Sequence, residues 1–138
     1  IASSNQIKMK NLKTLVISDN RLTDPSVAEF MRSENFPNLE SLDVGWNEVG
    51  NETAKVLGQT TSFPGLKILK MERGYIEVEA LKEMVQGSLM DQLQELDLSA
   101  NKLKDEGVKV LALAPKWKAL KQLRLSQNMF GDDDHRSR

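Results

Sequence analysis

The chain has 138 residues, of which 39% are hydrophobic and 28% charged, and its formal net charge is −1. This length usually means one domain; the small net charge gives no reason to expect a nucleic acid or an anionic membrane as partner, and no apolar run approaches the roughly 18 residues of a membrane helix. Because the chain has no cysteine, it cannot form disulfides, which favours a reducing, cytoplasmic location. The first residue is Ile1 rather than Met, so we expect a processed or excerpted chain.

One pattern of leucines and asparagine, L-x-x-L-x-L-x-x-N-x-L, recurs along the whole sequence. Its five copies are 27 residues apart and start at Leu12, Leu39, Leu66, Leu93 and Leu120. A fixed period in this range predicts a solenoid of stacked repeats. We therefore treat residues 1–138 as a single domain of about five repeats. Since neither end carries a recognisable polar capping repeat, we expect this domain to be part of a longer array.

Residues 1–11 resemble the tail of an earlier repeat. A large apolar residue occurs three residues before the start of each copy, and the set is Met9, Phe36, Phe63, Met90 and Trp117. We expect these five side chains to form a ladder that closes the core under the turn from helix to strand.

Each copy then begins with a short predicted strand, Leu15–Ile17 in the first repeat. Alternation along a strand sends the leucine positions into the core and the residues between them outward. Strands in stacked repeats must be parallel, because each is reached by a crossover of the same hand. Residues 27 apart therefore become neighbours, and one outward column is Val16, Asp43, Lys70, Asp97 and Arg124.

The ninth place of the repeat holds asparagine in four copies: Asn20, Asn47, Asn101 and Asn128. An amide side chain both donates and accepts hydrogen bonds, so we expect these residues to satisfy backbone groups in the turns rather than to form a polar binding site. The third copy has Gly74 instead. Glycine has no side chain to contribute, and the turn there is predicted to be looser or differently shaped.

The second half of each repeat has helical spacing of apolar residues. Asp24 followed by Pro25 is a reasonable helix start, with Asp24 as the cap. The inward faces predicted for the first, third and last helices are Val27, Phe30 and Met31; Leu81, Met84 and Val85; and Val108, Leu111 and Ala112. The sequence thus predicts an α/β arc, with a parallel sheet on the concave side and helices, which need more width, on the convex side.

The repeat, with its leucines, its asparagine and its helical second half, resembles the leucine-rich-repeat family, and within it the ribonuclease-inhibitor-like class. The resemblance implies a protein-binding module that uses the concave face. Two alternatives stay open by the same resemblance: a regulator of an enzyme such as a small GTPase, like the activating protein of Ran, or a structural segment of a larger receptor or bacterial effector.

Residues that could carry catalysis are scarce. The sequence has no phosphate-binding glycine loop, no cluster of cysteine or histidine, and a single histidine, His135, in a polar tail that also holds Asp132, Asp133 and Asp134. Adjacent acids on such a tail rarely form a metal site. We therefore expect no enzyme, cofactor, metal or small-molecule substrate, and a protein as the partner.

Tryptophan, arginine and tyrosine are the residue types enriched at interface hot spots. Trp46 and Arg73 lie at the eighth place of repeats two and three, and Tyr75 follows two residues after Arg73. We place the candidate site around them on the concave side, and the sheet residues included in it are Ile68, Lys70 and Asp43. Two other interpretations stay open. Arg73 and Trp46 would form only a local cation–π contact, and the outward charges, which alternate in sign, would only stabilise one another.

Overall fold

The computed structural model describes residues 8–114 and 117–129, which form ten elements that alternate between strand and helix except where α3 is followed by α4. In chain order these elements are β1 (Thr14–Val16), α1 (Asp24–Met31), β2 (Ser41–Asp43), α2 (Asn51–Leu57), β3 (Ile68–Lys70), α3 (Val78–Met84), α4 (Leu89–Gln92), β4 (Glu95–Asp97), α5 (Lys104–Leu113) and β5 (Gln122–Arg124). The polar tail with Asp132, Asp133, Asp134 and His135 lies outside the described residues.

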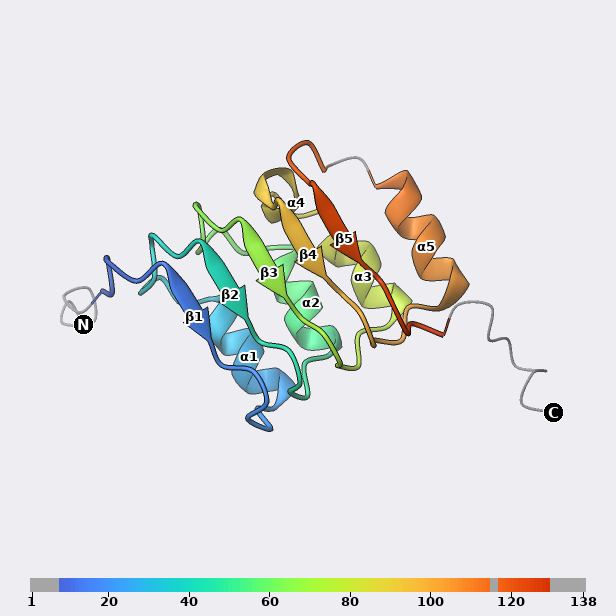
Figure 1. The fold of residues 1–138 in the computed structure, drawn as a ribbon, viewed down its shortest axis with the longest axis horizontal. Coiled ribbons are helices and arrows are strands. Elements are labelled where there is room, and N and C mark those ends of the chain that lie inside the picture. The colour runs from blue at the N-terminus through green and yellow to red at the C-terminus, as the bar shows by residue number, and fades with distance from the viewer. Residues whose placement is uncertain (1–7, 115–116, 130–138) are drawn as a thin grey trace.

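The five strands form one parallel sheet in the order β1-β2-β3-β4-β5 (Figure 1). Their register places each residue opposite the one 27 positions later, and Leu15, Leu42, Leu69, Leu96 and Leu123 form one row across the sheet. Each strand begins and ends one residue earlier than predicted. Ile17 still donates its N–H to Asp43 O at 2.9 Å, but the chain then enters the turn.

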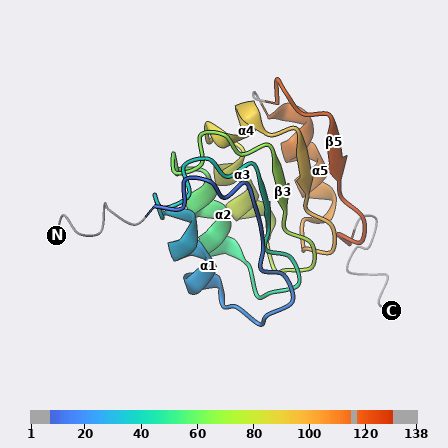
Figure 2. The ribbon, with the colours of Figure 1, turned by 60° about the vertical axis from the view of Figure 1, so that its left-hand side comes forward.

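The described helices all cover the same face of this sheet. Figure 2 shows α1, α2 and α3 forming one layer and the strands forming the other. Because a helix is about 10 Å wide and neighbouring strands lie about 4.8 Å apart, the helical layer takes the outer side of an arc. The predicted α/β leucine-rich-repeat solenoid is therefore confirmed.

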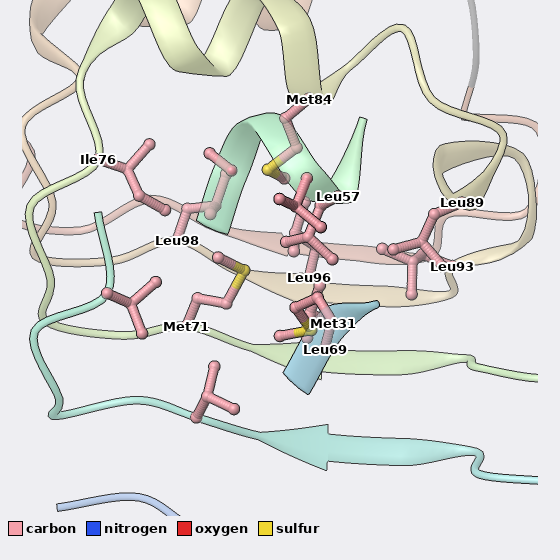
Figure 3. Packing of buried hydrophobic residues seen from close by; sticks show 14 of the residues in the cluster. Met31, Leu57, Leu69, Met71, Ile76, Met84, Leu89, Leu93, Leu96 and Leu98 are labelled. Atoms are coloured by element: carbon pink, nitrogen blue, oxygen red, sulfur yellow. The ribbon is translucent and has the colours of Figure 1, made fainter. Parts of the chain in front are cut away.

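The core lies between the two layers, where repeated leucines of the strands such as Leu69 and Leu96 pack with apolar side chains of the helices such as Leu57 and Met84 (Figure 3). Leu69 and Leu96, in the central repeats, are buried almost completely, whereas Leu15 and Leu123, in the terminal strands, are only partly buried. Within the described residues, a neighbouring repeat covers the central leucines on both sides but the terminal ones on one side only.

Three predicted core residues, Met9, Val108 and Ala112, are exposed for the same reason. In the ladder before each repeat, Phe63 and Met90 are buried, but Met9 is 52% exposed. On the inward face predicted for α5, Leu111 is buried, while Val108 is 41% exposed and Ala112 is also exposed. In the described part of the chain, no helix packs on the outer side of α5.

The asparagine side chains bond to turn backbone as predicted. Those of Asn47, Asn101 and Asn128 also join neighbouring repeats, whereas that of Asn20 donates to Ile17 O and Ser18 O of its own turn. The Asn47 side chain accepts at Oδ1 from the N–H groups of Asn20, at 2.9 Å, and Leu22, at 2.8 Å. Its Nδ2 donates to carbonyls of its own turn and to Ile17 O at 3.0 Å. Since Asn47 is buried, these bonds keep polar backbone groups from being left unpaired away from water.

Gly74 changes the hydrogen bonds of its turn without changing the backbone conformation of the residue before it. Arg73 has φ 61°, like the equivalent residues of the other repeats, and Gly74 donates its N–H to Ala100 O at 3.1 Å. A Cβ at Gly74 would lie 2.5 Å from Val49 O. The glycine is thus required by close packing of two turns, and the turn is not looser.

The cap of α1 lies one residue earlier than predicted. Thr23 is the cap: its Oγ1 accepts from Ser26 N at 3.3 Å, and Asp24 is the first residue of the helix. The carboxylate of Asp24 instead reaches the start of α2 in the next repeat.

Candidate functional site

The turns that follow the strands hold the candidate site, at the arrowhead ends of β1 to β5 (Figure 1). In every repeat, the residue at the eighth place has a left-handed backbone, and the residues are Asp19, Trp46, Arg73, Ala100 and Gln127, with φ between 57° and 61°. This conformation is rare for a bulky residue such as tryptophan. The stacking imposes it: Trp46 N donates to Glu72 O of the next repeat at 2.7 Å, and Arg73 N donates to Ser99 O at 2.8 Å.

These rigid turns bring together the aromatic and cationic side chains. The Arg73 guanidinium carbon lies 4.2 Å from the centroid of the Trp46 ring, and Lys102 Nζ lies 5.2 Å from the centroid of the Tyr75 ring. Both rings stay accessible, with Trp46 47% and Tyr75 53% exposed. The cation–π contact predicted as one possibility between Arg73 and Trp46 is therefore present.

Between these side chains lies an open hollow of about 380 Å³, which we call the turn-edge hollow. The residues that line it come from the eighth, ninth and tenth places of the repeats, and they are Arg21, Trp46, Asn47, Glu48, Arg73, Gly74, Tyr75, Ala100, Asn101, Lys102 and Met129. It contains three of the six predicted site residues, namely Trp46, Arg73 and Tyr75.

The other three predicted residues lie on the exposed face of the sheet and do not line the hollow. Asp43 and Lys70 are paired in the register of β2 and β3, and Ile68 stands at the start of β3, opposite Ser41 and Glu95. Lys70 is exposed and Ile68 is half-buried. The six residues thus form two groups, one in the turns and one on the sheet.

The alternating column on the sheet is not held together by ion pairs. Within residues 8–114 and 117–129, no carboxylate of this column lies within 4.0 Å of a Lys70 or Arg124 nitrogen. Asp43 and Asp97 instead accept a hydrogen bond from the backbone two residues on, at 2.9 Å in each case, from Gly45 N and Ser99 N. A second outward column, formed by Lys13, Glu40, Lys67, Gln94 and Lys121, does contain one ion pair, between Lys13 and Glu40 at 3.6 Å.

Of the residues at the tenth place of the repeat, sequence reasoning identified only Tyr75. That column runs Arg21, Glu48, Tyr75, Lys102, Met129, and all five residues line the hollow. The same period of 27 that identified the eighth-place column would have found it. The sequence pattern did not show that the eighth and tenth places face one another across a turn.

Two other features are absent from the part of the chain that the structure describes. No group of three or more His, Asp or Glu side chains there could hold a metal ion. None of the described helices is both long enough and apolar enough to span a membrane.

A parallel sheet of 27-residue repeats, with helices on one face and a ladder of buried asparagines, defines a leucine-rich-repeat solenoid. Three segments of the chain, residues 8–31, 37–58 and 93–112, match the family model described as "Leucine Rich repeat". The chain is thus a leucine-rich-repeat protein.

The solved structures that are similar to this chain include the following two. One is the C-terminal domain of tropomodulin from Caenorhabditis elegans, with a TM-score of 0.72 and 16% sequence identity over 88% of this chain and 79% of that one. The other is an internalin from Listeria monocytogenes, with a TM-score of 0.43 and 22% identity over 93% of this chain and 45% of that one. No curated protein sequence matches closely enough to name as a relative. At such low identity, the tropomodulin domain supports the fold alone.

Proposed function

We propose that this chain is a scaffold for protein–protein interaction, and that it binds its partner through the concave sheet and the adjoining turns of repeats two and three. The observation that carries the proposal is the exposed stack of Arg73 on Trp46, beside Tyr75. These are the residue types that contribute most to binding energy at protein interfaces.

The backbone of this stack supports the same proposal. Trp46 and Arg73 are each held by a backbone hydrogen bond to the next repeat, so little conformational entropy is lost when a partner orders them. Lys70 and Asp43 lie on the sheet beside these turns, where a partner that fills the hollow would also contact them.

Three further points belong to this proposal. The helical second half of the repeats supports the ribonuclease-inhibitor-like class, and the lack of cysteine supports a cytoplasmic location. The partly buried leucines of β1 and β5 support stacking of further repeats in a longer array. We propose that the chain acts by binding alone, without catalytic activity.

Site-specific cross-linking would test the scaffold. Tyr75 is replaced by a photo-reactive phenylalanine analogue, and Lys109, on α5, is replaced by the same analogue as a control. Proteins captured only from the Tyr75 position are identified, purified, and titrated calorimetrically against the intact chain. We expect Trp46→Ala to weaken binding by about 2 kcal/mol or more, with almost no loss of stability, because Trp46 is exposed.

A matched control is Leu113→Ala, since Leu113 is an exposed apolar residue on the helical side. If Leu113→Ala weakens binding and Trp46→Ala does not, the partner binds the helical face. If Trp46→Ala unfolds the chain, Trp46 is a packing residue and the proposed site is wrong.

A further inference from the structure

The turn-edge hollow collects positive charge that no acid in it neutralises. Arg21, Arg73 and Lys102 line it together with one acid, Glu48. Within the described residues, the ion pairs closer than 4.0 Å involve none of these three cations. A chain with a net charge of −1 thus has a local cluster of cations available for a negatively charged ligand.

Two of these cations are oriented by aromatic rings and not by carboxylates. The guanidinium of Arg73 lies over Trp46, and the ammonium of Lys102 lies over Tyr75. A ring face attracts the cation but accepts no strong hydrogen bond from it. The N–H groups of Arg73 therefore stay free to bind a carboxylate, which an arginine can grip with two parallel hydrogen bonds.

The hollow is also apolar in part. Trp46, Tyr75 and Met129 are all exposed large side chains that line it. Its volume of about 380 Å³ accommodates a few side chains. An occupant that satisfies both surfaces must carry carboxylates next to an apolar side chain.

A second hollow next to this one limits how far negative charge can extend. Asp24, Glu48 and Glu77 line it, and it shares Glu48, Tyr75 and Lys102 with the turn-edge hollow. These acids would repel a long polyanion such as a nucleic acid that continued past Lys102. A short stretch of acidic residues in a protein meets no such obstacle.

We propose that the turn-edge hollow binds an acidic segment of the partner protein, in which carboxylates flank an apolar residue. Arg73 and Lys102 bind the carboxylates, and Trp46, Tyr75 and Met129 receive the apolar side chain. This inference rests on the proposed scaffold function and names the chemistry of its partner.

Selection from a library of random peptides displayed on phage, with the intact chain as bait, tests the proposal. We expect the enriched peptides to combine Asp or Glu with an apolar residue. A synthetic copy of one should bind about tenfold or more weakly to Arg73→Gln and to Lys102→Gln. Arg73→Lys should recover part of the loss, and added salt should weaken binding.

The matched control is Lys67→Gln, which removes the same charge before the start of β3, at the opposite edge of the sheet. It should leave the affinity unchanged, and all variants should keep the thermal midpoint of the intact chain. Asp132, Asp133 and Asp134 are an acidic stretch of this chain itself and lie outside the described residues. To exclude competition between this stretch and the peptide, the titrations are repeated with the three residues changed to Ser.

Several results would overturn the acidic-segment proposal: no enriched peptide, enriched peptides without acids, or affinities that Arg73→Gln and Lys102→Gln leave unchanged. So would a single-stranded oligonucleotide that binds more tightly than the peptide and also requires Arg73. Neutral peptides that require Trp46 would contradict this inference but leave the scaffold function standing. The scaffold function itself fails if no cross-linked protein is captured from the Tyr75 position.

Discussion

The carboxylate of Asp24 caps a helix of the next repeat through Thr53. Asp24 Oδ1 accepts from Thr53 Oγ1 at 2.6 Å, from Thr53 N at 3.0 Å and from Gly50 N at 2.9 Å. Its other oxygen, Oδ2, accepts from Glu52 N at 2.9 Å. Gly50, which precedes α2, offers no side chain of its own as a cap. The bonds that begin α2 therefore come from repeat one, so the two repeats are joined by a charged cap as well as by their core.

Removing this charge should weaken the joint between the two repeats. We expect Asp24→Asn to lower the free energy of unfolding by about 1–2 kcal/mol, because an amide has one acceptor oxygen in place of two and no charge at the helix start. Denaturant melts measure the change. Glu34→Gln, on an exposed residue, is the control and should change stability by less than about 0.5 kcal/mol.

Stability should also depend on acid through the same residue. Burial raises the pKa of Asp24, but the hydrogen bonds from the Thr53 side chain and from the backbone of Gly50, Thr53 and Glu52 outweigh it, and they lower the pKa below its ordinary value of 3.8. A folded-state pKa below the unfolded one gives stability that is fully present above the unfolded pKa and is lost as pH falls through the folded pKa.

The stability difference between the intact chain and Asp24→Asn should therefore be largest near neutral pH and shrink as the pH falls below 3.8. Melts at a series of pH values measure it. A difference that stays constant down to strongly acidic pH would show that Asp24 contributes through its shape and not through its charge.

Gly74 should not tolerate a side chain. A Cβ there would lie 2.5 Å from Val49 O and 2.9 Å from Asn101 Oδ1, so the two turns would have to separate. We expect Gly74→Ala to cost about 1–3 kcal/mol, measured by thermal or denaturant melts. Gly65→Ala is the control: its Cβ would meet only Leu39 O, at 3.7 Å, and it should be neutral or slightly stabilising. Equal losses at both positions would contradict the close packing of the turns.

The leucines of one row should differ in their contribution according to their place in the stack. Leu96→Ala should cost about 2–5 kcal/mol, as expected for a fully buried leucine, because Leu96 is only 1% exposed. Leu15→Ala, at the equivalent place of β1, should cost less, since Leu15 is partly buried. Denaturant melts compare the two variants. A loss below about 0.5 kcal/mol for Leu96→Ala would mean that its side chain does not face the core.

Most of the repeat architecture follows from the sequence. A period of 27 residues requires equivalent positions to stack, so the register of the sheet and the inward direction of Leu42, Leu69 and Leu96 could be predicted before any coordinates. The period also predicted that Trp46 and Arg73 are neighbours, because adjacent strands bring together residues one repeat apart.

Contacts between different places of the repeat could not be predicted in this way. That Asp24 caps the helix of the next repeat, and that Lys102 lies over Tyr75, depends on the left-handed turn after each strand and on the direction of each side chain. The exposure of Met9 and Val108 likewise depends on which neighbours cover them. A linear pattern specifies which positions stack on one another. The tertiary structure alone decides which different positions meet, because that depends on backbone dihedrals and packing that the period leaves free.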